Sequence, residues 1–204
     1  MFAQTIRGKV SDPDAVRVAV DRWTRDLGPT AKGWFGTTGG VTDDGDLFVL
    51  IRFESEGSAR FNSARPEQDQ WWSEFSKLLE GEPTFKDSNN VLIEPVGDLD
   101  SAGFVQVICG QSSDLERSRQ LMTDSQSARS AARPEILGSV SVGHEDGKFT
   151  SVLYFSSEEE ARAGERKELP PEAREAIEEM RSLGVTPPEY LDLKTPWLDA
   201  PKGL

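Results

Sequence analysis

GTTGGVTDDGDLFVLIRFESEGSAR, residues 36–60, decides the fold, because the chain repeats this stretch as GSVSVGHEDGKFTSVLYFSSEEEAR at residues 138–162. The two stretches align without a gap at an offset of 102 residues, so that Phe53 falls on Phe155 and Ser55 on Ser157. The same offset places FAQTIRG, residues 2–8, on FVQVICG, residues 104–110. The chain therefore contains one structural unit twice.

Each copy is expected to begin with a strand and a helix. In the first copy, Asp12 is a candidate N-cap and Pro13 suits the first helical position. Apolar residues then recur at helical spacing from Val16 to Leu27. In the second copy, residues 113–114 again supply a polar helix start, but the stretch that follows contains fewer apolar residues. We expect a helix in both copies.

A hairpin, an interrupted helix and a short last strand complete each copy. Asp44-Gly45 and Asp146-Gly147 predict tight turns, because Asp-Gly tolerates positive φ. Apolar residues on both faces of residues 47–53 predict a strand covered on both sides. Ser55 and Ser157 are candidate N-caps of the helix that follows. Prolines then interrupt that helix, the last strands are expected at residues 90–93 and 190–193, and the tail at 196–204 is expected to pack down or fray.

Composition restricts the classes of function. The 204 residues include 36% apolar residues, enough for a sizeable core, and carry a formal net charge of −13, which disfavours binding to nucleic acid or to anionic membranes. Cys109 and His144 are the single residues of their types, so an internal disulfide and the usual zinc sites are excluded. We expect no metal and no cofactor. The sequence shows no secretory or membrane-spanning stretch, which predicts a cytoplasmic location.

The order strand, helix, hairpin, helix, strand predicts an α+β chain made of two ferredoxin-like βαββαβ units. The expected boundaries are residues 1–97 for the first unit, 98–103 for a linker and 104–204 for the second unit with its tail. This pattern resembles the dimeric α/β-barrel superfamily, which includes antibiotic-biosynthesis monooxygenases. The resemblance implies a fused pair whose antiparallel sheets lie face to face in an intramolecular pseudo-dimeric barrel, as a monomer or weak homodimer. The segment NSARPEQDQWW also resembles actinobacterial proteins of this type.

Candidate ligand-binding residues follow from the resemblance and from residue chemistry. Cofactor-free oxygenases of the family place an Asn and a Trp near a pocket at the second helix, and Asn62, Trp71 and Trp72 are the matching types here. Arg65 adds a fixed cation beside the helix break, and the two tryptophans add flat stacking surface. The haem-degrading branch uses a His on this helix, and residues 55–79 contain none, which argues against haem.

Three further candidates lie elsewhere in the chain. Gln4 and Gln106 share strand faces with apolar residues, so each must find hydrogen-bond partners or line a cavity. His144 is a candidate lone base in the second hairpin.

For each candidate a structural interpretation stays open. The tryptophans are of the type that packs a core, and Asn62 with Arg65 is suited to capping a broken helix. The glutamines are suited to hydrogen bonding that holds strands together, and His144 is suited to a surface turn.

Two classes of function remain. The first is a binder of a small apolar or aromatic ligand enclosed by the barrel, with cofactor-free oxygenation as its candidate reaction; whether the protein is an enzyme stays open. The alternative is a non-catalytic structural or protein-interaction role with a filled interior. The offset places Ala173 and Arg174 where the first copy has Trp71 and Trp72. This difference in bulk predicts that any ligand site lies in the first copy.

Overall fold

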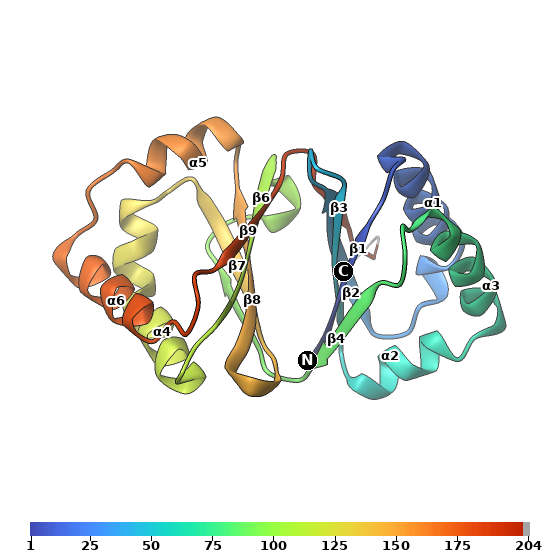
Figure 1. Ribbon diagram of the computed structural model, residues 1–204, viewed down its shortest axis with the longest axis horizontal. Helices are drawn as coiled ribbons and strands as arrows, with labels where there is room; N and C mark the ends of the chain where they lie inside the picture. Colours follow the sequence, from blue (N-terminus) through green and yellow to red (C-terminus); the bar gives the residue numbers. More distant parts are fainter. Residues whose placement is uncertain (202–204) are drawn as a thin grey trace. The chain divides into compact units, whose positions relative to one another are not determined.

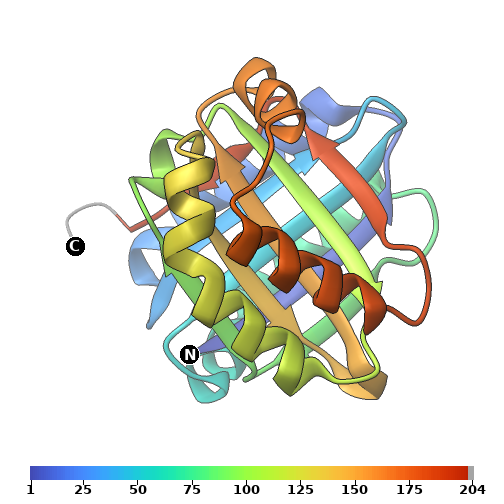
Figure 2. The same ribbon diagram turned by 90° about the vertical axis from the view of Figure 1, so that its left-hand side faces the viewer.

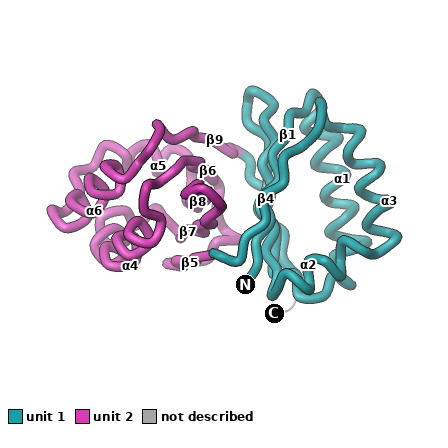
Figure 3. Tube along the Cα trace, turned by 60° about the horizontal axis from the view of Figure 1, so that its bottom comes forward, with its two compact units in different colours: residues 1–90, 195–204 teal, residues 91–194 magenta. Residues whose placement is uncertain are grey.

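The chain folds into two compact units, each built around its own antiparallel sheet of five strands. The structure is a computed structural model and describes residues 1–201. Unit 1 comprises Met1–Asn90 together with Thr195–Leu204, and unit 2 comprises Val91–Lys194 (Figure 3). Within the described residues, no helix combines the length and apolar character needed to cross a membrane. The predicted α+β class with two ferredoxin-like units is confirmed.

Unit 1 is a sheet in the order β10-β2-β3-β1-β4, with helices α1 and α3 over one face (Figure 1). Its strands are β1 (Phe2–Lys9), β2 (Trp34–Val41), β3 (Asp46–Phe53), β4 (Thr84–Ser88) and β10 (Trp197–Asp199). Its helices are α1 (Pro13–Asp26), α2 (Glu56–Ser63) and α3 (Pro66–Phe75).

Unit 2 repeats this plan in the order β5-β7-β8-β6-β9. Its strands are β5 (Val91–Pro95), β6 (Phe104–Gln111), β7 (Ile136–Gly143), β8 (Lys148–Phe155) and β9 (Glu189–Leu193). Its helices are α4 (Leu115–Ala132), α5 (Glu158–Glu165) and α6 (Pro171–Ser182). Figure 2 shows α4 and α6 lying over one face of this sheet.

Local sequence signals set the ends of these elements as predicted. The Asp12 carboxylate accepts a hydrogen bond from the Ala15 N–H at 2.9 Å and caps α1. Ser55 and Ser157 cap α2 and α5 in the same way, each through its side-chain oxygen. Gly45, in the first hairpin turn, has a φ of 81°, which glycine adopts without steric cost. Local chemistry therefore sets the first hairpin turn and the starts of these three helices.

Strand β3 is buried on both faces, as its continuous apolar run predicts. Val49 and Phe53, on the helix-covered face, are 7% and 6% exposed. Phe48 and Leu50, on the opposite face, are fully buried. The strand pairs with β1 in an antiparallel register that places Ile6 opposite Val49. This central pair of strands forms the floor of the cavity described below.

The strands that end each repeat differ from the prediction. The first repeat has an unpredicted strand, β4, beside β1, and its following strand β5 pairs with β7 of unit 2. In the second repeat β9 holds the place beside β6, and the tail forms β10, which pairs with β2 of unit 1. Residues 90–93 and 190–193 are thus not equivalent to one another. Each repeat contributes its final strand to the other unit's sheet.

Candidate functional site

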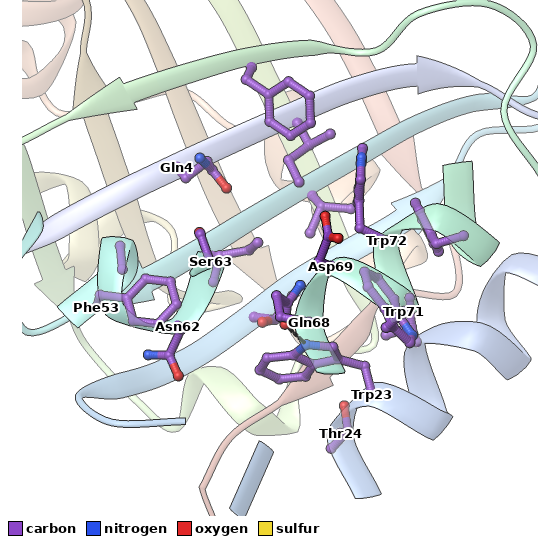
Figure 4. Close-up of a pocket in the computed structure, with 18 residues that line it drawn as sticks. Gln4, Trp23, Thr24, Phe53, Asn62, Ser63, Gln68, Asp69, Trp71 and Trp72 are labelled. Atoms are coloured by element: carbon purple, nitrogen blue, oxygen red, sulfur yellow. Dashed lines mark hydrogen bonds between the residues drawn. The ribbon is translucent and has the colours of Figure 1, made fainter. Parts of the chain in front are cut away.

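Unit 1 contains a cavity of about 290 Å³ between its sheet and its helices (Figure 4). Strands β1 and β3 form its floor, and residues of α1, α2 and α3 form its walls. Most of its lining is apolar, and the aromatic members are Trp23, Phe53, Trp71, Trp72, Phe75 and Phe85. The cavity lies on the helix-covered face of the sheet, whereas the sequence led us to expect a ligand enclosed by a barrel.

Helix α3 places three aromatic rings along the cavity. Pro66 begins this helix after the break, which brings Trp71 and Phe75 onto one face four residues apart. Their rings stack with centroids 4.7 Å apart, and Trp72 meets the Phe85 ring edge-on at 5.3 Å. The Trp71 indole donates its N–H to the Ala19 carbonyl of α1 at 2.9 Å. Trp71 therefore joins two helices as well as lining the cavity.

A second link between α1 and α3 crosses the cavity wall. The Trp23 indole Nε1 donates to Gln68 Oε1 at 2.6 Å. Because an indole N–H can only donate, it fixes the carbonyl of Gln68 toward Trp23 and directs the amide nitrogen elsewhere. Neither residue was among the predicted site residues. The helical spacing of Trp23 identified it as apolar packing, and no sequence signal identified Gln68.

Asn62 and Arg65 support the break between α2 and α3. The buried Asn62 lines the cavity, but its amide donates to the carbonyls of Lys32 and Ser58, both at 2.9 Å. Its carbonyl accepts from Arg65 Nη1 at 3.2 Å. Arg65 is absent from the cavity lining and also bonds Thr30 and Glu67. These contacts tie the break to the loop at Lys32 and Thr30, and neither side chain caps α3.

The two predicted glutamines have matching partners in different units. Gln4 lines the cavity, and its amide donates to Asp87 on the neighbouring strand β4 at 2.8 Å. Gln106 makes the equivalent bond to Asp192 on β9 at 3.0 Å, within unit 2. The structure thus gives both glutamines a cross-strand hydrogen bond and places one of them at the cavity.

His144 belongs to unit 2. It precedes the short turn Glu145–Gly147, and its Nε2 lies 3.0 Å from the Thr150 hydroxyl. Of the predicted site residues, the structure therefore brings Gln4, Asn62, Trp71 and Trp72 together at one cavity. Arg65 lies behind Asn62, and Gln106 and His144 lie in the other unit.

The corresponding region of unit 2 is packed with small and charged residues. Gly164 stands where the first repeat has Asn62, and a Cβ there would overlap Glu135, which pairs with Arg133 and Lys167. Ala173, which stands where the first repeat has Trp71, is fully buried. The Arg162 guanidinium lies over the Phe104 ring at 5.2 Å. Close packing around Gly164 contrasts with the open space beside Asn62 in unit 1.

The cavity lining is unsuited to binding haem iron or a zinc ion through histidine. Among the described residues that line it there is no His or Cys, and residues 1–201 hold no cluster of metal-ligating side chains. A ligand at this site would be held by aromatic contact and by a few hydrogen bonds.

Solved structures with the same fold span the whole chain. Two are described as a "putative monooxygenase": one from Lactobacillus acidophilus NCFM has a TM-score of 0.74 at 14% identity, covering 98% of this chain and 95% of its own. The other, from Fusobacterium nucleatum, has a TM-score of 0.74 at 8% identity, covering 100% and 95%. An anthrone oxidase-like protein gives 0.67 at 10% identity, covering 100% and 96%. No family model and no curated protein sequence matches the chain.

These matches establish the fold. Each covers nearly the full length of both chains, so the duplicated ferredoxin-like architecture is shared with proteins described as monooxygenases. The predicted resemblance to such proteins is confirmed at the level of the fold. Because a fold hosts many activities, function is argued from the residues of the cavity.

Proposed function

We propose that unit 1 binds a small, planar, apolar or aromatic molecule in the cavity between its sheet and helices. The observation that carries this proposal is the cavity of about 290 Å³ with six aromatic side chains in its lining. This volume is close to the lower end of the roughly 300–1,000 Å³ typical of small-molecule sites, which are apolar with a few polar groups. A bicyclic aromatic compound suits this volume and this lining.

The stacking surface of the site comes from α3. Trp72 is half-buried, and its ring borders both Trp71 and Phe85. An aromatic ligand beside this ring gains stacking of about 0.5–1.5 kcal/mol beyond the burial of its apolar area. Unit 2 lacks the aromatic pair, which supports one binding site per chain.

Isothermal titration calorimetry with neutral naphthalene derivatives tests the proposal. We expect one molecule bound per chain, and we expect Trp72→Ala to weaken binding by about tenfold or more through lost stacking and burial. Trp197→Phe is the matched control, because Trp197 lies in unit 1 outside this cavity. The absence of binding by any planar aromatic probe, or equal losses in both variants, would contradict the proposal.

Oxygenation of the bound molecule is the second candidate function, favoured by the shared fold with proteins described as monooxygenases. Without a cofactor, the ligand must form its own stabilised carbanion and react with dioxygen. An activated ring CH₂ would become C=O, with one oxygen atom retained and the other released as water. An oxygen electrode tests this: ligand-dependent oxygen uptake that falls in Trp72→Ala supports catalysis. Binding without oxygen uptake would show that the protein binds the ligand without oxidising it.

A further inference from the structure

Asp69 is the one ionisable side chain among the described residues that line the cavity of unit 1. Figure 4 shows it on α3 near Trp72, with its carboxylate directed away from the helix backbone. The residue is exposed, so it lies where the cavity opens to solvent. Within residues 1–201 the structure gives this carboxylate no hydrogen-bond or ion-pair partner. The cavity therefore combines aromatic walls with a single available negative charge.

Arg65 and the arginines of α1 and α2 are engaged in other contacts. Arg65 bonds Asn62, Thr30 and Glu67. The arginines of α1 and α2 pair with acidic residues, as Arg17–Asp21, Arg22–Glu74, Arg25–Asp26 and Arg60–Glu56. The chain as a whole carries a net charge of −13. A ligand cation would thus meet an unneutralised carboxylate, whereas a ligand anion would meet repulsion.

We propose that this cavity selects cationic aromatic ligands, with a protonated amine on Asp69 and the ring system against Trp72. The inference rests on the proposed binding function and adds the charge class of the ligand. Aromatic rings favour a cation over their faces, and a nearby carboxylate adds a charge-assisted hydrogen bond. The resulting site resembles in chemistry the aromatic cages that recognise organic ammonium groups.

Three compounds with the same naphthalene ring system and different charges test whether the cavity prefers a cation. We would measure 2-naphthylmethylamine, 2-naphthylmethanol and 2-naphthoate by calorimetry at pH 7 and low salt. We expect the amine to bind about tenfold or more tightly than the alcohol, since hydrogen bonds to charged groups exceed neutral ones, and the carboxylate to bind most weakly. Added salt should reduce the advantage of the amine, because Asp69 is exposed.

Two variants test whether Asp69 causes the preference for the amine. Asp69→Asn should remove the advantage of the amine and leave the affinity for the alcohol unchanged. Asp44→Asn, an equal charge change in an exposed hairpin turn outside the cavity lining, should keep the wild-type order.

The outcomes separate the two proposals. Equal affinity of the wild-type protein for amine and alcohol, or an amine preference that persists in Asp69→Asn, overturns the charge assignment while binding of the alcohol still supports an aromatic site. Failure of every member of the series to bind overturns both proposals.

Discussion

Asn62 is the residue at which a structural role and a binding role compete most directly. Its amide satisfies the Lys32 and Ser58 carbonyls, and its carbonyl receives Arg65. We expect Asn62→Ala to lower the free energy of unfolding by about 2–3 kcal/mol, because buried polar partners lose their hydrogen bonds. Urea denaturation measures this. Asn89→Ala, which removes an exposed amide 3.4 Å from Glu56, should change stability by less than about 0.5 kcal/mol. Equal stabilities for both variants would contradict the structural role.

The sequence predicted part of the site for identifiable physical reasons. Trp71 and Trp72 were accessible to prediction because their helical spacing after Pro66 is a local property. Asp69 and Gln68 could not be predicted as site residues. Each is a polar residue on a partly exposed helix, and the sequence does not indicate which groups of other elements such a residue faces. Arg65 was expected to face a ligand, and its contacts with Thr30 depend on a loop 35 residues away in the chain. Local periodicity finds helix faces, and only the packed structure assigns the groups between them.

Gly164 is a second residue whose role depends on close packing. A Cβ at this position would overlap the Glu135 carboxylate on the neighbouring segment. Gly164→Ala is therefore expected to destabilise unit 2 by about 1–3 kcal/mol, despite the better helix propensity of alanine. Gly57→Ala in α2 is the matched control, since its Cβ meets only the Ser55 hydroxyl at 3.7 Å. Thermal unfolding compares the two. A stabilised Gly164→Ala variant would show that Glu135 moves at little cost.

At the scale of elements, an ion cluster joins the residues just before β7 to the segment just after α5, where Glu135 pairs with Arg133 and Lys167. Burial raises the pKa of Glu135, but hydrogen bonds from Arg133, from its own backbone N–H and from Lys167 outweigh burial and hold the pKa below its ordinary value. The folded protein thus favours the carboxylate. Its stabilising contribution is present above the unfolded-state pKa of about 4.3 and is lost as pH falls through the lower folded-state pKa.

Urea unfolding across a pH series measures this contribution. The loss of stability in Glu135→Gln, relative to the wild-type protein, should be largest near neutral pH and should shrink as pH falls below about 4. Glu179→Gln is a control from an exposed pair with Arg117, and its effect should fall with added salt. A Glu135→Gln difference that is constant with pH would contradict the charged state assigned to this cluster.

The strands show where element prediction failed. The hairpin strands β2 and β3 were predictable because Asp-Gly turns and apolar runs are local signals. Strand β4, TFKDS, was missed because Phe85 is its only apolar residue, and as the outer strand of its sheet it is mostly exposed. Strand β10 was expected as a tail, since its three residues gain their order from pairing with β2, far away in the sequence.

At the scale of the whole molecule, the duplication was visible in the sequence but the exchange of strands was not. An offset of 102 residues aligns equivalent positions without indicating which sheet a strand joins. The structure places β5 of the first repeat beside β7 and β10 of the second repeat beside β2. Each repeat thus depends on the other for one strand of its sheet.

This exchange predicts the behaviour of a chain cut between the repeats. A protease site inserted between Asp100 and Ser101, both exposed in the short turn Leu99–Ser101, would separate the repeats covalently. We expect the two fragments to stay together, because five residues of β5 and three of β10 remain paired with the other repeat. The ion pair of the buried Glu94 with the half-buried Arg129, at 3.1 Å, further anchors β5 to α4.

Size-exclusion chromatography of the cut protein shows whether the two fragments stay associated. The cut protein should elute at the position of the intact chain and separate into fragments only in denaturant, while a denaturing gel confirms complete cleavage. Arg129→Met in the cut protein is expected to weaken the association, because Glu94 would then be buried without its cation, a loss worth about 3–5 kcal/mol for buried pairs. Arg117→Met, which breaks an exposed pair on the same helix, should leave the elution unchanged. Fragments that separate under native conditions would show that the exchanged strands contribute little to holding the repeats together.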